Sequence, residues 1–108
     1  MMTLQLVSDQ RDLLEEIATF LLKNRLIANA MISETQFLEL DEDNPDQSQV
    51  MTHSKYILKG ISKSLLFHAI NKELRASYAH NMPLVYSEPI ILIDPDQTER
   101  IITKLRQV

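Results

Sequence analysis

The 108-residue chain contains no cysteine and only one glycine, Gly60. Without cysteine it has no disulfide, no thiolate metal ligand and no cysteine nucleophile, and a cytoplasmic location is expected. Loops that cradle phosphate groups need several glycines at fixed spacing, so a single glycine excludes them. These absences remove several common kinds of catalytic and nucleotide-binding site.

Positive charge is also scarce. Eleven basic residues stand against fifteen acidic ones, a net charge of -4, so neither nucleic acid nor an anionic membrane is an expected partner. No apolar run approaches the length of a membrane span, and the N-terminus lacks the basic and apolar regions of a secretory signal. With 44% hydrophobic residues, the chain is expected to form one globular domain over residues 1–108.

Alternating apolar residues predict a first strand over residues 3–7, and apolar residues at helical spacing predict a helix after it. Ser8 or Asp9 is expected to cap the start of this helix. Asn24 is expected to end it in the left-handed conformation. The apolar face of the helix is expected to consist of Leu13, Leu14, Ile17, Ala18, Leu21 and Leu22.

Two long strands joined by an acidic loop are expected next. The first covers residues 26–40 with a bulge near 33–34, and the second covers residues 50–59. The tract between them, 41–49, is polar and contains proline, which predicts a loop. The loop lacks the glycine and the glutamate of an EF-hand, so a solvated turn is favoured over a calcium site at its aspartates, Asp41, Asp43 and Asp46.

A helix, a strand and a short final helix complete the expected order. The second helix is expected to begin within residues 60–62, with Ser62 as its cap. Residues 82–94 contain an apolar run that predicts a buried strand. Pro95 opens the last helix, with Asp94 or Asp96 as its cap. The apolar face of the second helix is expected to contain Leu65, Leu66, Ala69, Ile70 and Leu74.

The element order predicts an α+β fold, a ferredoxin-like βαββαβ sandwich with a short extra C-terminal helix. Its sheet would be antiparallel and four-stranded, with both main helices on one face. Right-handed crossovers place the first and third strands centrally and the 82–94 strand at an edge of the isolated chain. A free apolar edge invites pairing with another chain, so self-association is expected.

Three short sequences occur in the order found in a known family. Arg25-Leu26-Ile27-Ala28-Asn29 is similar to an Arg-Leu-Ala-Ala-Cys junction, and Leu58-Lys59-Gly60 to Leu-Lys-Thr. Tyr86-Ser87-Glu88-Pro89 keeps the tyrosine and second proline of His-Pro-Tyr-x-x-Pro-Glu. Through these matches and the final helix, the chain resembles the CutA-like divalent-cation tolerance proteins of the PII-like superfamily. The resemblance implies a non-enzymatic homotrimer that binds a divalent cation or small ligand at clefts between subunits.

The sequence departs from that family at several motif positions. Asn29 stands in place of the cysteine, Leu84 in place of the histidine and Ile90 in place of the last glutamate, and the family's Trp-Glu-Gly is absent. A carboxamide is a far poorer copper ligand than a thiolate. Soft-metal binding is therefore not carried over, whereas the fold, the trimer and a cleft near Tyr86 and Lys59 are.

A small set of residues is assigned to the expected site. A divalent metal is assigned to His53, which shares a strand with two of the ligand candidates. The other histidines, His68 and His80, show no metal-ligand spacing. No Gly-x-Ser-x-Gly elbow is present, and no catalytic residue is assigned. The candidates for contacts with a small ligand are Tyr86, Lys59, Glu88 and Tyr56.

Other interpretations remain open beside this one. Each histidine, and the pairing of Tyr86 with Pro89, is also explained by an ordinary structural role. The whole chain could be a structural or protein-interaction module that uses the open sheet face. An enzyme with an acid/base site built from Glu88, Lys59 and a histidine is a third class. RNA recognition is set aside, because strand 51–59 lacks the aromatic spacing for base stacking and the chain is acidic.

Overall fold

The computed structural model describes residues 1–43 and 49–107 of the chain. Asp46 and the rest of the expected acidic loop between 44 and 48 lie outside the described residues. The elements are β1 (Met2–Ser8), α1 (Arg11–Lys23), β2 (Met31–Leu40), β3 (Val50–Ser62), the 3-10 turn η1 (Ser64–Leu66), α2 (Phe67–Tyr78), β4 (Leu84–Pro89) and α3 (Pro95–Thr103).

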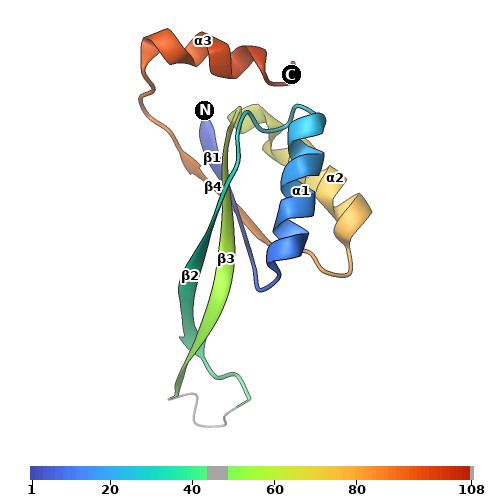
Figure 1. Ribbon diagram of the computed structural model, residues 1–108, viewed down its shortest axis with the longest axis vertical. Helices are drawn as coiled ribbons and strands as arrows, with labels where there is room; N and C mark the ends of the chain where they lie inside the picture. Colours follow the sequence, from blue (N-terminus) through green and yellow to red (C-terminus); the bar gives the residue numbers. More distant parts are fainter. Residues whose placement is uncertain (44–48, 108) are drawn as a thin grey trace.

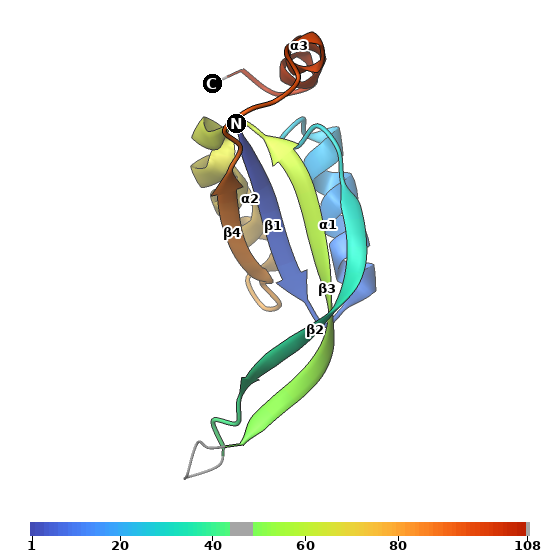
Figure 2. The same ribbon diagram turned by 90° about the vertical axis from the view of Figure 1, so that its left-hand side faces the viewer.

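The four strands form one antiparallel sheet in the order β2-β3-β1-β4. Helices α1 and α2 both lie on one face of it, and α3 lies beyond one end (Figure 1). Figure 2 looks onto the opposite face, which no helix covers. The α+β ferredoxin-like prediction is confirmed, with β1 and β3 central and β4 at an edge.

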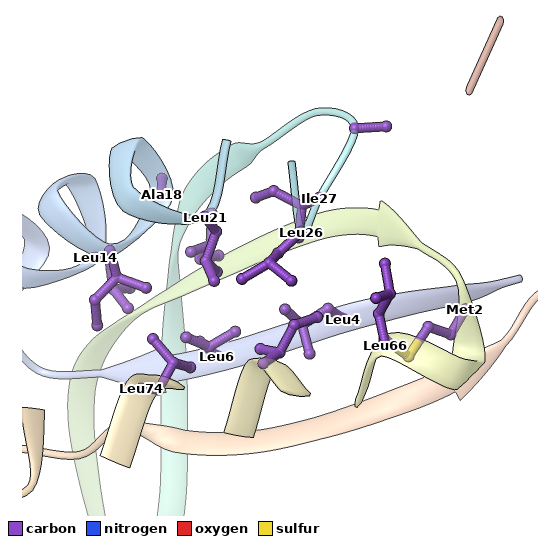
Figure 3. Packing of buried hydrophobic residues seen from close by; sticks show 14 of the residues in the cluster. Met2, Leu4, Leu6, Leu14, Ala18, Leu21, Leu26, Ile27, Leu66 and Leu74 are labelled. Atoms are coloured by element: carbon purple, nitrogen blue, oxygen red, sulfur yellow. The ribbon is translucent and has the colours of Figure 1, made fainter. Parts of the chain in front are cut away.

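Alternate residues of β1 point to the two faces of the sheet. On the helix-covered face, Met2, Leu4 and Leu6 are almost completely buried against α1 and α2 (Figure 3). Figure 3 shows Leu14 and Leu21 of α1 directed toward these side chains. The expected apolar face of α1 is confirmed except for Leu22, which is exposed.

The expected N-cap of α1 is wrong, and Asn24 is the C-cap as expected but not in the left-handed conformation. The residue that precedes the helix is Gln10, which makes no side-chain capping bond. Ser8 lies too early, and its Oγ accepts a hydrogen bond from the Gln10 backbone N–H at 3.1 Å. At the C-terminus the left-handed residue is Arg25, with φ of 58°, rather than Asn24. The Asn24 side chain donates to the Phe20 carbonyl at 2.8 Å, which keeps Asn24 within the last turn.

The long hairpin begins later and ends later than expected. β2 starts at Met31, and residues 26–28 form a buried loop. The Ala28 N–H donates to the Ile61 carbonyl at 2.8 Å, so this loop is held across the end of β3. Pairing runs without interruption from Met31 with Lys59 to Leu40 with Val50, so the predicted bulge is wrong.

Residues 60–62 belong to β3 and not to a helix. Gly60 lies under the 26–29 loop, and a Cβ there would stand 2.5 Å from the Asn29 backbone oxygen. Ser62 is fully buried, and its hydroxyl donates to the Leu26 carbonyl instead of capping α2. Leu65, expected on the buried face of α2, is 77% exposed because it lies in the 3-10 turn.

The apolar run after residue 89 is not a strand. β4 ends where its neighbour β1 begins, at the pair Met2 and Pro89. The Ile90 N–H makes one more bond, to the Met1 carbonyl at 3.1 Å. Beyond it, Ile91 and Leu92 are 89% and 88% exposed. Asp94 then caps α3 with Pro95 as its first residue, which decides between the two expected starts.

Arg25 also fastens the C-terminal segment to the rest of the fold. Its guanidinium donates to the carbonyls of Thr103, Lys104 and Leu105 at 2.7, 3.3 and 3.4 Å. The Arg106 backbone N–H donates to the Arg25 carbonyl at 2.8 Å. Leu105 is buried in the core. The segment after α3 is therefore anchored from the end of α1.

Candidate functional site

Three of the four ligand candidates lie on the open face of the sheet. Residues that are directly paired across antiparallel strands point to the same face. Gln5 of β1 is paired with Lys59 of β3 on one side and with Tyr86 of β4 on the other. Glu88 is paired with Thr3, one row further along the same face. The register thus brings Tyr86, Lys59 and Glu88 onto one surface.

Gln5 lies between these residues, and the sequence interpretation did not select it. It is only 3% exposed, although it is on the face that no helix covers. A polar residue at an outward position of an alternating strand is ordinarily solvated, so the alternation alone carried no signal. The register provides the signal, because Gln5 is flanked by two long side chains, those of Lys59 and Tyr86.

Tyr56 is separated from the other ligand candidates by the sheet. It is paired with Ser8 and with Glu34, so its side chain points to the helix-covered face. There the Arg11 guanidinium lies 5.9 Å from the centre of its ring. Tyr56 packs against the hydrophobic core. Its assignment to the same ligand surface as Tyr86 therefore has no support in the geometry.

His53 lies on the part of the hairpin that projects beyond β1 (Figure 2). It is six residues from Lys59 along β3, about 20 Å at the usual rise of a strand. Its Nε2 lies 3.5 Å from Glu39 Oε1. Within residues 1–43 and 49–107, no three histidine, aspartate or glutamate side chains gather in a way that could hold a metal. Among these described residues, His53 and Glu39 form a two-residue group at this place.

A hollow of about 310 Å³ lies beside this pair, at the described end of the hairpin. Acidic side chains and Met51 line it together with His53. A second hollow, of about 390 Å³, lies where β1 meets α1 and includes Lys55 and His80. His80 is thus near the start of β4 and not on the Gln5 row. Neither hollow contains Lys59, Tyr86 or Glu88.

Asn29, at the position of the family's cysteine, has a structural contact. Its side-chain oxygen accepts a hydrogen bond from the Ile61 backbone N–H at 3.1 Å. The neighbouring Ala28 N–H bonds to the Ile61 carbonyl. Together these bonds satisfy both backbone groups of Ile61 at the end of the β1–β3 ladder. The residue that would supply a thiolate in the family closes a loop here.

The open face offers side chains that can form hydrogen bonds with a ligand. Gln5 contributes a carboxamide, Lys59 an ammonium group and Tyr86 a phenol, all on one row. Such groups bind and orient a ligand through hydrogen bonds. A general base needs to lie within hydrogen-bond reach of a second reacting group. The histidine of the hairpin, His53, lies far from this row.

No protein-family model matches the chain, and no curated protein matches its sequence. Solved structures do match it in fold. CutA1 from Pyrococcus horikoshii has a TM-score of 0.82 at 14% identity and covers 99% of this chain and 100% of its own. CutA1 from Oryza sativa has a TM-score of 0.81 at 16% identity, with 99% and 94% covered.

A periplasmic divalent cation tolerance protein, CutA from Archaeoglobus fulgidus, has a TM-score of 0.79 at 18% identity and covers 98% of this chain and 100% of its own. These matches span nearly the whole of each chain. At such low identity they establish the fold and leave the site residues undetermined. None of the described helices is both long and apolar enough to cross a membrane. The chain thus has the ferredoxin-like fold of the CutA1 divalent cation tolerance proteins.

Proposed function

We propose that the protein is a non-enzymatic, single-domain, CutA-like protein that associates with copies of itself, as a homotrimer, and binds a small ligand where the copies meet. The observation that carries the proposal is the shared position of Tyr86, Lys59 and Glu88 on the uncovered sheet face. The trimer comes from the resemblance to the CutA-like family. The absence of cysteine favours a cytoplasmic location.

Two further features support self-association. The β4 edge has no neighbouring strand in a single chain, and unpaired sheet edges invite pairing. Ile91 and Leu92, which follow β4, are almost fully exposed. Large exposed apolar side chains that lie next to one another mark contact surfaces more often than isolated ones do. A second copy of the chain that covers this segment and the β4 edge would pair the free strand edge and bury the two apolar side chains.

A divalent cation is the other ligand that the resemblance implies. His53 and Glu39 would supply two ligand atoms from one chain, and a zinc ion takes four. A second subunit would therefore have to complete the coordination. Calorimetric titration with zinc, copper and nickel tests this, because His53→Ala should abolish the heat whereas Tyr86→Ala should leave it unchanged. Equal heats from both variants and the parent would exclude His53.

The oligomeric state is the decisive measurement for the proposal. Size-exclusion chromatography with light scattering at micromolar concentration should give three times the mass of one chain. Leu92→Lys should lower that mass, because it places a charge on the proposed contact. Leu65→Lys is the matched control, since Leu65 is also exposed but lies on the opposite, helix-bearing side of the sheet. A stable monomer, or equal loss in both variants, contradicts the proposed association.

A protein-interaction module that uses the open sheet face is the second candidate. The mixed polar and apolar character of that face favours it. It predicts a monomer whose Tyr86 row binds a macromolecular partner and no small ligand. The mass measurement separates it from the first proposal.

A further inference from the structure

The projecting half of the hairpin has an unpaired strand edge on its β3 side. β3 is paired with β1 only as far as Tyr56, so residues 50–55 have a neighbouring strand on the β2 side alone. Figure 2 shows this part of the hairpin extending beyond the end of β1. A two-stranded ribbon is at best marginally stable by itself in water, and unpaired edges invite pairing. A further strand along the outer edge of residues 50–55 would therefore stabilise the hairpin.

The outer edge of β4 is a second unpaired edge in the same chain. Among the described strands, β4 pairs only with β1. The two unpaired edges cannot meet within one chain. Ser87 lies in the row of Leu4 and Gly60, and Ser54 is six residues from Gly60 along β3, about 20 Å at the usual rise of a strand. A contact between the two edges has to join separate copies.

One antiparallel register matches the charges of the two edges. In this register, residues 55 to 50 of one copy lie opposite residues 86 to 91 of the next. Glu88 is the only charged residue of β4, and it comes to lie opposite His53 and diagonal to Lys55. Among the ion pairs of residues 1–43 and 49–107, none includes Glu88 or Lys55. Opposite charges at such positions stabilise a pair of strands.

The same register brings exposed apolar side chains together. Val50 comes to lie opposite Ile91, and Met51 opposite Ile90. Val50 is 56% exposed in the single chain and Ile91 is 89% exposed. Leu40, the β2 partner of Val50, is also exposed and would extend the apolar contact. Pairing in this register therefore buries apolar side chains at both ends of the molecule.

Other registers fit less well. A slip by one residue moves the side chains of one strand to the opposite face of the joined sheet. A slip by two residues toward the hairpin tip places Glu88 opposite Met51, whose β2 partner is Glu39, so that two carboxylates approach each other. A slip by two residues the other way places Tyr86 and Ser87 opposite residues 56–57, which are already paired with β1.

We propose that the outer edge of residues 50–55 pairs with residues 86–91 of a second copy of the chain, antiparallel, with Ser54 opposite Ser87. The inference rests on the proposed self-association and names the two surfaces that form the contact. Each copy offers one edge of each kind, so the contact is head-to-tail and repeats until a ring closes. A homotrimer is a closed ring of this kind.

Disulfide formation tests the pairing directly, because the chain contains no cysteine of its own. Directly opposite residues of antiparallel strands have Cα atoms about 4.5–5.5 Å apart, which a disulfide can span. Ser54 and Ser87 are both exposed, so replacing them with cysteine is a mild change. The double variant Ser54→Cys/Ser87→Cys, oxidised with glutathione, should give covalent trimers in a non-reducing denaturing gel. Each single variant should give only the mass of one chain.

Gln36→Cys combined with Ser87→Cys is the matched control. Gln36 is exposed and lies opposite Ser54 on β2, so it is in the same row but one strand further from the proposed contact. This pair should give no cross-linked product. Cross-linking through Gln36→Cys would assign the contact to the β2 edge, and a dimer of Ser87→Cys alone would show that two β4 edges pair. Either result overturns the proposal, as does the absence of a product from Ser54→Cys/Ser87→Cys.

Charge reversal tests the register independently of cysteine chemistry. Glu88→Lys should raise the concentration at which copies associate by about fivefold, because it replaces attraction to Lys55 by repulsion. Adding Lys55→Glu to the same chain should restore the association. Circular dichroism reports whether each variant remains folded. Equal association by Glu88→Lys and the parent would contradict the register.

The mass of the parent protein in solution separates this inference from the proposed function. A trimer whose Ser54→Cys/Ser87→Cys variant forms no cross-link refutes the edge pairing alone. A ladder of cross-linked open chains, without a closed trimer, supports the edge pairing and refutes the homotrimer. A parent protein that stays monomeric refutes both.

Discussion

The two faces of β1 are both buried, but for different reasons and with different chemistry. On the face toward α1 and α2, the buried residues of the strand, Met2, Leu4 and Leu6, are apolar, and the helices complete the burial. On the other face, Gln5 and Val7 are also almost inaccessible, although no helix lies over them (Figure 2). There Gln5 is paired with Lys59 and Tyr86, and Val7 with Ile57 and Leu84, on the two neighbouring strands.

This difference separates stability from recognition within one sheet. The helix-covered face is built mainly from leucine, isoleucine and methionine, and its buried Ser62 hydroxyl is satisfied by the Leu26 carbonyl, so this face chiefly contributes free energy of folding. The open face contains a carboxamide, an ammonium group and a carboxylate in adjacent rows. Lys59 and Glu88 are exposed and solvated, so they cost little stability. The proposed function places its ligand on this face.

Leucine truncation on each face should give the largest contrast. Leu6 is fully buried against the helices, and Leu84 is 54% exposed on the open face beside Val7. Leu6→Ala should lower the free energy of unfolding by about 2–5 kcal/mol, since it removes transfer energy and leaves a cavity. Leu84→Ala should cost less than about 1 kcal/mol in the monomer. Urea unfolding followed by circular dichroism measures both.

Measuring Leu6→Ala and Leu84→Ala at several protein concentrations makes their comparison more informative. If copies associate over the open face, the cost of Leu84→Ala should grow with concentration, because the leucine is then buried in the assembly. The cost of Leu6→Ala should stay constant. Equal costs for the two variants at low concentration would show that the open face contributes to the core of a single chain.

The next largest expected effect on stability comes from Gly60, which packs against the 26–29 loop. A Cβ at Gly60 would meet the Asn29 backbone oxygen at 2.5 Å and the Ile27 side chain at 3.2 Å. Backbone cannot yield as a flexible side chain can, so Gly60→Ala should cost about 1–3 kcal/mol. Thr52→Ala on the exposed part of the same strand is the control and should change stability by less than about 0.5 kcal/mol. Urea unfolding of Gly60→Ala and Thr52→Ala measures the two changes in the free energy of unfolding.

An unchanged Gly60→Ala protein would mean that the 26–29 loop moves away from β3 without loss. In that case the hydrogen bonds that Ala28 and Asn29 make with Ile61 would not hold the loop rigidly. Hydrogen exchange at the Ile61 amide tests this separately, because a displaced loop exposes that amide to solvent.

Sequence patterns predicted the fold well where both periodicity and partners were local. The strand at 3–7 and the leucine stripe of α1 follow directly from alternation and helical spacing. Residues 26–28 were misassigned to a strand, because a short buried apolar run looks the same in a strand and in a buried loop. The loop exists because Arg25 turns the chain in the left-handed conformation, which a sequence pattern does not indicate for arginine.

The apolar run at 90–93 shows a second reason why a sequence pattern can predict a strand that does not form. Four consecutive apolar residues predict a buried strand, yet β4 ends at Pro89, which is paired with Met2, and only Ile90 makes a further bond, to the Met1 carbonyl. Strand length here depends on the partner and not on the segment itself. Likewise, alternation placed Gln5 on the outward side of β1, but only the register with Lys59 and Tyr86 makes it buried. Both facts depend on long-range pairing.

The smallest expected effect comes from Tyr78, which lies where the two helices meet. Tyr78 at the end of α2 packs edge-to-face on Phe20 of α1, with ring centres 6.3 Å apart. Burial raises the pKa of its phenol above the ordinary value of 10.0, and the negative charge of Glu16 raises it further. The helix layer thus contains a group whose ionisation the folded state resists, and the neutral form is favoured.

The sign of the pH effect follows from this shift. The unfolded chain loses the Tyr78 proton at about pH 10, whereas the folded chain retains it to higher pH. The stabilisation is complete below pH 10 and is lost as the pH rises through the pKa of the folded state. Tyr78→Phe keeps the ring contact with Phe20 and should flatten that part of the decline in stability above pH 10. Glu16→Gln should flatten it less, because burial is the larger cause. Urea unfolding from pH 9 to 11 gives the comparison, and a decline unchanged by Tyr78→Phe would move the alkaline sensitivity out of the helix layer, to the open face or the hairpin.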